Sequence, residues 1–200
     1  MYHATVPGKV WTRKRQWMGN VVPALVFVPG FVAGLVLILT SGDPLGLGLW
    51  LLVGSFALGW LTVNAFGLFA NQAMRAELSA RLGLTASGGE FVGFARPTYR
   101  SGLDPHEDVG FLVLGEEGLR FTGDTLTVDL PWAAVERIRL RPNIHTLLGL
   151  GGWISIEGHL DGAPVRMLVE PRNHNTLWAN ARERRDLSKR IAAKQGSHKT

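Results

Sequence analysis

Three arginines at alternating positions are the residues whose types and spacing most suggest binding chemistry. Arg137, Arg139 and Arg141 are separated by Ile138 and Leu140. Because successive side chains of a β-strand point to opposite faces, the three guanidinium groups would lie along one face. A row of this kind could bind an anionic lipid headgroup or an acidic protein partner.

An ordinary structural role competes with binding at this row. Arginines on a solvent-facing strand commonly pair with residues of adjacent strands, and the neighbouring predicted strands supply Glu157, Arg166 and Glu170. Both glutamates have the parity that points their side chains to the arginine side of the sheet. Cross-strand pairing is therefore the simpler expectation, and binding is the alternative.

Arg96 and Arg100 are further candidate contacts for a partner or a lipid. They lie in a predicted loop, residues 95–109, that carries more acidic than basic side chains, which disfavours recognition of inositol phosphates. The residues in this loop that could bind a metal are Asp104, His106, Glu107 and Asp108. They are too close together for a calcium loop or a zinc site, so we predict no metal.

No constellation in the chain predicts catalysis. The histidines are scattered, and no nucleophile-elbow, metalloprotease or phosphate-loop motif accompanies them. The chain has no cysteine, which excludes thiolate chemistry and cysteine-bound metal. Asn143, His145 and His174 lie near predicted turns and could form a polar site only if the fold brings them together. We therefore expect a protein that is not an enzyme and has no cofactor.

The N-terminal third has the composition of a membrane hairpin. Between Arg15 and Arg75 the only charged residue is Asp43. The apolar runs 21–40 and 45–70 are each long enough to span the hydrocarbon core, which is about 30 Å thick. The turn-forming residues between them predict a tight connection, so we assign residues 21–70 to a two-helix transmembrane hairpin.

Basic residues set the expected orientation of this hairpin. Lysines and arginines precede the first span and follow the second, whereas the hairpin tip has none. The positive-inside rule then predicts an integral protein of the cytoplasmic membrane with both termini in the cytoplasm. We assign residues 1–20 to a basic N-terminal segment and residues 194–200 to a basic tail. The N-terminal 16 residues and residues 182–199 carry most of the positive charge and would rest against lipid headgroups. No motif supports nucleic-acid binding.

Small residues within the spans predict close helix packing. Gly30 and Gly34 form one small-residue pair, and Ser55 and Gly59 form another. Packing between the two spans of one chain is the simpler reading, and dimerisation is the alternative. Asn64 would then make an interhelical hydrogen bond. The spans contain no ionisable residue, so transport by this chain has no candidate residue.

After the hairpin, the pattern changes to that of a soluble domain. Residues 71–84 favour a helix that extends the second span, and a linker follows to residue 88. Period-two alternation then predicts an antiparallel meander in residues 89–193, with a final helix from about Thr176 to Ala193 capped by Asn173 or Asn175. The predicted strands are 90–95, 110–114, 118–122, 125–130, 135–141, 152–158 and 163–170.

This order of elements resembles a known superfold. Residues 110–123 read as a strand, a turn and a strand, and residues 128–138 read as an apolar strand that leads through Pro131 and Trp132 into a short helical turn. The pattern resembles the pleckstrin-homology (PH) superfold, in the variety found in small bacterial membrane proteins and GRAM-like domains. The resemblance implies an α+β, PH-like domain: a seven-stranded antiparallel roll or barrel capped by a C-terminal helix.

The same resemblance implies binding rather than chemistry. We expect a membrane-anchored, cytoplasmic, PH-like scaffold module that binds a protein partner or a second copy of itself. The alternative is a module that senses anionic lipid, with Arg96, Arg100 and the arginine row as the contacts.

Overall fold

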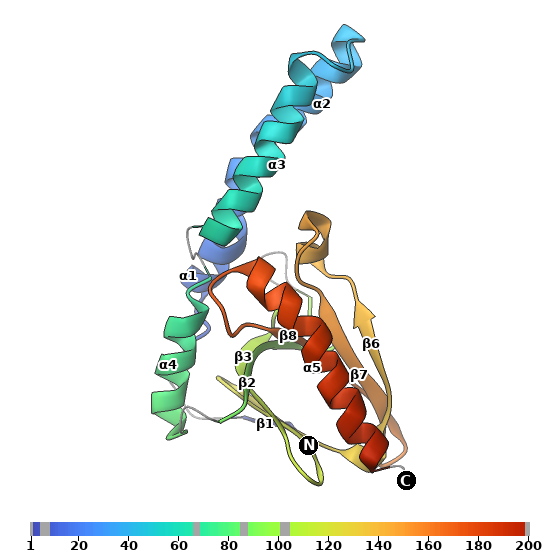
Figure 1. Ribbon diagram of the computed structural model, residues 1–200. Coiled ribbons are helices and arrows are strands. Elements are labelled where there is room, and N and C mark those ends of the chain that lie inside the picture. The colour runs from blue at the N-terminus through green and yellow to red at the C-terminus, as the bar shows by residue number, and fades with distance from the viewer. Residues whose placement is uncertain (1, 5–8, 66–68, 85–87, 101–104, 199–200) are drawn as a thin grey trace. The chain divides into compact units, whose positions relative to one another are not determined.

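The apolar run and the alternating run form two separate units in a computed structural model of the chain (Figure 1). The structure describes residues 2–4, 9–65, 69–84, 88–100 and 105–198. The helical unit comprises Arg13–Phe69, and the sheet unit combines Met1–Thr12 with Ala70–Thr200. Most of the predicted linker, the middle of the loop after residue 100 and the end of the basic tail lie outside the described residues.

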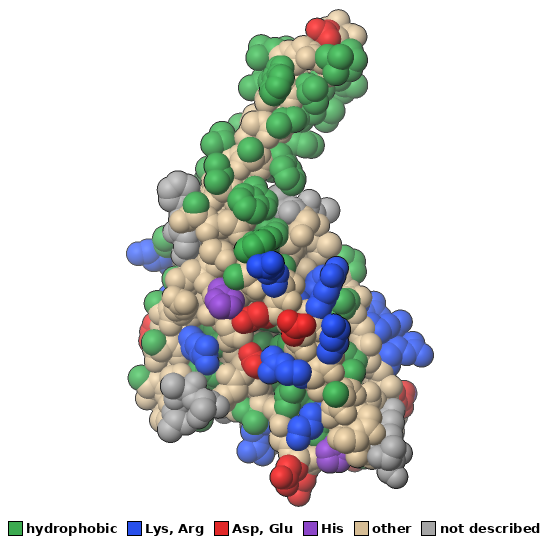
Figure 2. Space-filling model, viewed as in Figure 1, with side chains coloured by type: hydrophobic (Ala, Val, Ile, Leu, Met, Phe, Trp, Pro, Cys, Tyr) green, Lys and Arg blue, Asp and Glu red, His purple; other side chains and the backbone are tan. Residues whose placement is uncertain are grey.

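The helical unit consists of two long apolar helices. One runs without interruption through α1 (Arg13–Gln16), η1 (Trp17–Val21) and α2 (Val22–Ser41), and the other is α3 (Leu47–Ala65). Both are long and apolar enough to cross a membrane. Large apolar side chains point outward: Leu39 and Leu45 are 74% and 75% exposed. Figure 2 shows hydrophobic side chains over the visible face of these helices.

Small residues bring α2 and α3 into close contact. A Cβ atom added to Gly34 would lie 2.7 Å from the carbonyl oxygen of Gly48, and one added to Gly30 would overlap the hydroxyl of Ser55. Gly59 approaches the side chain of Phe27 in the same way. The packing residues predicted from the sequence therefore meet within one chain.

Asn64 makes a hydrogen bond within its own helix, and the interhelical bond that its position suggested stays a prediction. Its side-chain nitrogen donates to the carbonyl oxygen of Trp60 at 2.9 Å, one turn earlier in α3.

The seven strands predicted between residues 90 and 170 all form, with small shifts at their ends. They are β2 (Glu90–Ala95), β3 (Asp108–Leu114), β4 (Gly118–Gly123), β5 (Leu126–Pro131), β6 (Val135–Arg141), β7 (Trp153–Leu160) and β8 (Ala163–Pro171). A short strand from the N-terminus, β1 (Tyr2–Ala4), pairs with β5. The sheet order is β1-β5-β4-β3-β2-β8-β7-β6, and all the pairings are antiparallel.

This order corrects the prediction of a single meander. Strands β2 to β5 form one meander and β6 to β8 form another, and the pairing of β2 with β8 joins them. Strands β5 and β6 are consecutive but are separated by the turn η2 (Trp132–Ala134) and lie far apart in the sheet order. Strand β6 therefore lies at one edge of the sheet.

Helix α5 (Leu177–Ser197) lies across one face of the sheet (Figure 1). Its buried Leu187 and Ile191 pack into the main core with the alternate, inward residues of the strands. The helix begins at Thr176, whose hydroxyl accepts from the Ala179 amide at 3.3 Å. Thr176 is therefore the cap, in place of the asparagines predicted from the sequence.

A second apolar cluster lies on β2 and β3. Helix α4 (Asn71–Leu82) contributes Met74 and Leu78, and the chain before α1 contributes the buried Val10 and Trp11. Helix α4 is not an extension of α3: it starts after Ala70, whose φ of 45° is left-handed. Residues 10–12 belong to the sheet unit, so its boundary differs from the predicted segment 1–20 because apolar burial holds this stretch in the core.

Substitution of Gly34 tests the helix contact. Gly34→Ala should destabilise the helical unit by about 1 to 3 kcal/mol, because the added methyl group would push apart two backbones. Gly54→Ala is the matched control, since a Cβ there meets nothing within 4 Å. Loss of helicity against dodecyl sulfate, followed by circular dichroism, measures both variants. Equal stability of the two would show that Gly34 is not at a tight contact.

Candidate functional site

The alternating arginines lie on the open face of the second meander, together with one carboxylate. Glu157 of β7 forms ion pairs with Arg139 and Arg141 of β6, the latter at 2.9 Å, and with Arg166 of β8 at 3.3 Å. The Ser155 hydroxyl donates to the same carboxylate at 2.7 Å. The predicted cross-strand pairing with Glu157 therefore forms, and it includes arginines from both flanking strands.

Pairing with one glutamate leaves this face strongly positive. We define the arginine face as Arg137, Arg139, Arg141 and Arg166 with Glu157, that is, four cations and one anion. Burial alone would raise the pKa of Glu157, but hydrogen bonds from Arg139, Ser155 and Arg141 lower that pKa to about 2. The carboxylate is ionised at neutral pH, so the face keeps a surplus of positive charge available to an anionic partner.

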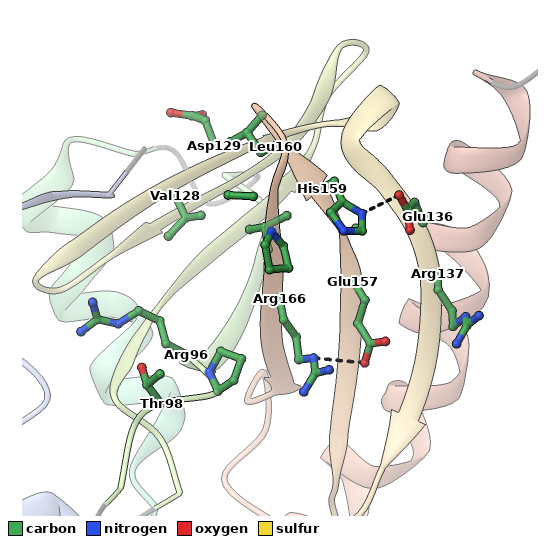
Figure 3. A pocket seen from close by; sticks show the side chains of 15 residues that line it. Arg96, Thr98, Val128, Asp129, Glu136, Arg137, Glu157, His159, Leu160 and Arg166 are labelled. Carbon is green, nitrogen blue, oxygen red and sulfur yellow. Dashed lines mark hydrogen bonds and ion pairs between the residues drawn. The ribbon is translucent and has the colours of Figure 1, made fainter.

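A pocket of about 770 Å³ adjoins the arginine face (Figure 3). Arg137 and Arg166 line it with Arg96 and Thr98. Figure 3 marks two pairs among its lining residues, Arg166 with Glu157 and His159 with Glu136, the latter at 2.7 Å. The lining combines side chains of both charges with apolar ones such as Val128, Leu160 and Val165.

The two loop arginines predicted as contacts differ in their positions. Arg96 forms a two-pronged ion pair with Glu107, with Nε at 2.9 Å from Oε1. Arg100 is exposed and donates to the backbone oxygens of Pro97 and Tyr99 at 2.7 and 2.9 Å. Only Arg96 lies beside the arginine face, through the pocket.

Glu170 does not pair with the arginines, which corrects the second half of the pairing prediction. It is 3% exposed and accepts four kinds of hydrogen bond: from His106 Nε2 at 2.8 Å, His145 Nδ1 at 3.2 Å, Asn143 Nδ2 at 2.9 Å and the Gly152 amide at 2.7 Å. Burial would raise the pKa of Glu170, but the charge of His145 and the hydrogen bonds from both histidines hold it well below its ordinary value.

Aromatic and cationic groups close over this histidine-glutamate cluster. The ring of Trp153 packs edge-on against His106 at 5.0 Å, and the guanidinium of Arg172 lies 4.5 Å from the ring centre of Trp11. Arg172 also donates to Asn71 at 2.8 Å. His106 lies directly on β2 at Gly93, where any Cβ atom would overlap the imidazole.

Histidines hydrogen-bonded to a carboxylate also occur in catalytic sites, but a substrate would have no access to this cluster. His106 is 1% exposed and His145 is 5% exposed. The described residues contain no group of three or more His, Cys, Asp or Glu arranged to hold a metal ion. A satisfied buried carboxylate of this kind fixes the positions of the loops that supply its donors. We therefore interpret the cluster as structural.

Sequence reasoning missed this cluster because its members are far apart along the chain. His106 and Glu170 are separated by 64 residues. Of the three residues predicted near turns, Asn143 and His145 both bond to Glu170. His174 bonds to Glu183 at 2.8 Å instead. Within the described residues, the loop candidates for metal binding also diverge, since Glu107 pairs with Arg96.

Asp108 and Asp124 stabilise the turn between β4 and β5 and its surroundings through hydrogen bonds and an ion pair. Asp108 accepts from the amides of Thr125 and Leu126, each at 2.9 Å, and burial raises its pKa to about 6 despite these bonds. Asp124 accepts from the Trp11 amide at 2.8 Å and forms an ion pair with Arg81. These carboxylates hold the N-terminal stretch and α4 against the sheet.

No protein-family model, curated protein or solved structure matches this chain. The arrangement of its own residues therefore carries the functional argument.

Substitution of Glu170 tests its structural role. Glu170→Gln should destabilise the sheet unit by about 3 kcal/mol, because a buried charge network loses its anion while the histidines and Arg172 stay buried. Glu116→Gln, in an exposed turn, is the control and should change stability little. Urea titration of the full-length protein, with protease resistance of the sheet unit as the readout, compares them. Near-equal urea midpoints for the two variants would show that the cluster does not stabilise the sheet unit.

The pKa of Glu157 predicts a pH-dependent contribution to stability. Because its folded pKa is about 2, below the ordinary 4.5, the stabilisation is present above pH 4.5 and is lost as the pH falls toward 2. Glu157→Gln should therefore cost about 1 to 2 kcal/mol at neutral pH, after allowance for exposure of the arginines. The difference from the parent should shrink between pH 4.5 and 2. A difference independent of pH would contradict the ionic role.

Proposed function

We propose that this protein is a membrane-anchored, non-enzymatic binding module whose arginine face binds an acidic region of a partner protein. The observation that carries the proposal is the surplus of charge on this face, where one glutamate pairs with three of the four arginines. Complementary charge steers a partner to such a surface and fixes its orientation.

The helical unit supplies the anchor in this proposal. Its two helices are long and apolar enough to cross a membrane, and their outward side chains are mostly apolar. Residues 1–12 and 70–200 belong to one unit. A hairpin whose two ends lie on the same side of the membrane allows both stretches to join in that unit. Basic residues at both of these ends support a cytoplasmic location for the sheet unit.

A PH-like fold of the sheet unit is part of the proposal. Two antiparallel meanders joined through β2 and β8, with a C-terminal helix across one face, support this assignment. A binding role agrees with the burial of the histidine-glutamate cluster, the closest arrangement to a catalytic site among the described residues. The second candidate function, binding of anionic lipid, is favoured by the same arginine surplus beside a membrane anchor.

The first experiment crosslinks the full-length protein in its native membrane and identifies what copurifies in mild detergent. Arg137, Arg139 and Arg141 are changed together to Gln, which removes charge and keeps length. The control changes three exposed basic residues of α5 to Gln: Arg185, Lys189 and Lys194. A stoichiometric protein retained by the parent and the control, and lost from the arginine variant, is the expected result.

Two results would overturn the proposal. Retention of every partner by the arginine variant would remove this face from binding. Copurification of anionic lipid alone, lost from the arginine variant, would replace the protein partner with a lipid.

A further inference from the structure

Strand β6 is an open edge beside the arginine face. The sheet order ends at β6, which pairs only with β7 among the described strands. An edge strand leaves the backbone N–H and C=O groups of alternate residues without a ladder partner. Strand β6 is seven residues long, whereas β1 at the opposite edge has three. Of the two edges, β6 therefore offers the longer template for another strand.

One end of this edge is already covered. The side-chain nitrogen of Gln195 in α5 donates to the Val135 carbonyl oxygen at 2.6 Å. Beyond a bulge between Val135 and Arg137, the pairing with β7 continues in regular register to Arg141 opposite Trp153. The stretch from Arg137 to Arg141 is therefore the regular part of the edge, and no described strand pairs with its outer side.

The two sides of this stretch differ in chemistry. Arg137, Arg139 and Arg141 point to the arginine face, and Leu140 points to the side that carries α5. Leu140 is 45% exposed, and Ile144, in the turn η3 (Ile144–Leu148) that follows, is 56% exposed. A strand added here would place alternate side chains opposite cations and the others beside apolar surface.

Charge decides which kind of strand fits. Pairing of β6 with β6 of a second copy would bring two rows of arginines together, and like charges directly opposite one another destabilise a sheet. An acidic strand would instead neutralise the surplus that Glu157 leaves. The edge therefore selects an acidic segment of a different protein.

We propose that β6 binds, as an added strand, an extended segment of a partner protein in which acidic residues alternate with apolar residues. The acidic side chains lie opposite Arg137, Arg139 and Arg141, and the apolar ones lie on the side of Leu140. Backbone hydrogen bonds supply affinity, and the alternation supplies specificity. This inference rests on the proposed function of the arginine face and adds the conformation and pattern of the partner.

The test uses the full-length protein in nanodiscs of zwitterionic lipid and a soluble synthetic peptide in which Glu alternates with Val. A second peptide has the same composition with all Glu residues in one block, so charge is kept and alternation is lost. Fluorescence anisotropy measures affinity. Hydrogen–deuterium exchange of the β6 amides reports new backbone hydrogen bonds, which binding through charge alone would not produce.

We expect the alternating peptide to bind roughly tenfold or more tightly than the block peptide, and to slow exchange in β6. Replacement of Arg137, Arg139 and Arg141 by Gln should weaken binding by a similar factor. The matched variant of Arg185, Lys189 and Lys194 should bind as the parent does. These results together support strand addition at β6.

Other outcomes separate the inference from the proposed function. Binding without slower exchange in β6, or equal binding of the two peptides, overturns strand addition while the arginine face remains a binding surface. Failure of the alternating peptide to bind, with a native partner still captured through the arginines, does the same. Binding to vesicles of anionic lipid and not to either peptide overturns both proposals.

Discussion

A buried carboxylate holds the sheet unit together. Glu170 lies near the end of β8, and its charge is tolerated only because the chain surrounds it with donors from three other segments. His106 ends the loop after β2, His145 and Asn143 come from the turn after β6, and Gly152 precedes β7. The two meanders meet where β8 pairs with β2, which is where this carboxylate lies. The joint between them therefore depends on satisfying one negative charge.

Two glutamates on the same meander illustrate how context decides the role of a charge. Glu157 and Glu170 both face away from the main core. Glu157 forms ion pairs with arginines at the surface, whereas Glu170 bonds to buried histidines, one of which packs against Trp153. The three arginines that pair with Glu157 are 38% to 43% exposed, so solvent screens these ion pairs and the surplus of positive charge stays available for binding. Burial around Glu170 makes its partners structural instead.

The sequence predicted local structure well, because local structure follows from periodicity. Alternation located β2 and β6 at their observed bounds, and the glycines of the two spans were identified as packing residues. Long-range placement was not predictable in this way. The parity of Glu170 indicates its face but not its burial, which depends on His106 packing over Gly93. Val10 and Trp11 are apolar but lie in a basic stretch, so their burial was not predicted. This burial depends on contacts with α4 and β3.

The position of Trp11 has a consequence for the order in which the protein assembles. Its amide bonds to Asp124 across 113 residues of chain, a separation that would make closing a flexible loop slow and entropically costly. Within the helical unit, however, the ring of Phe69 packs on Gly19. Once the two helices have paired, the residues between them no longer count toward the loop, and the contact becomes much more local. Pairing of the two apolar helices before the sheet forms would therefore shorten the loop that must close when Trp11 reaches Asp124.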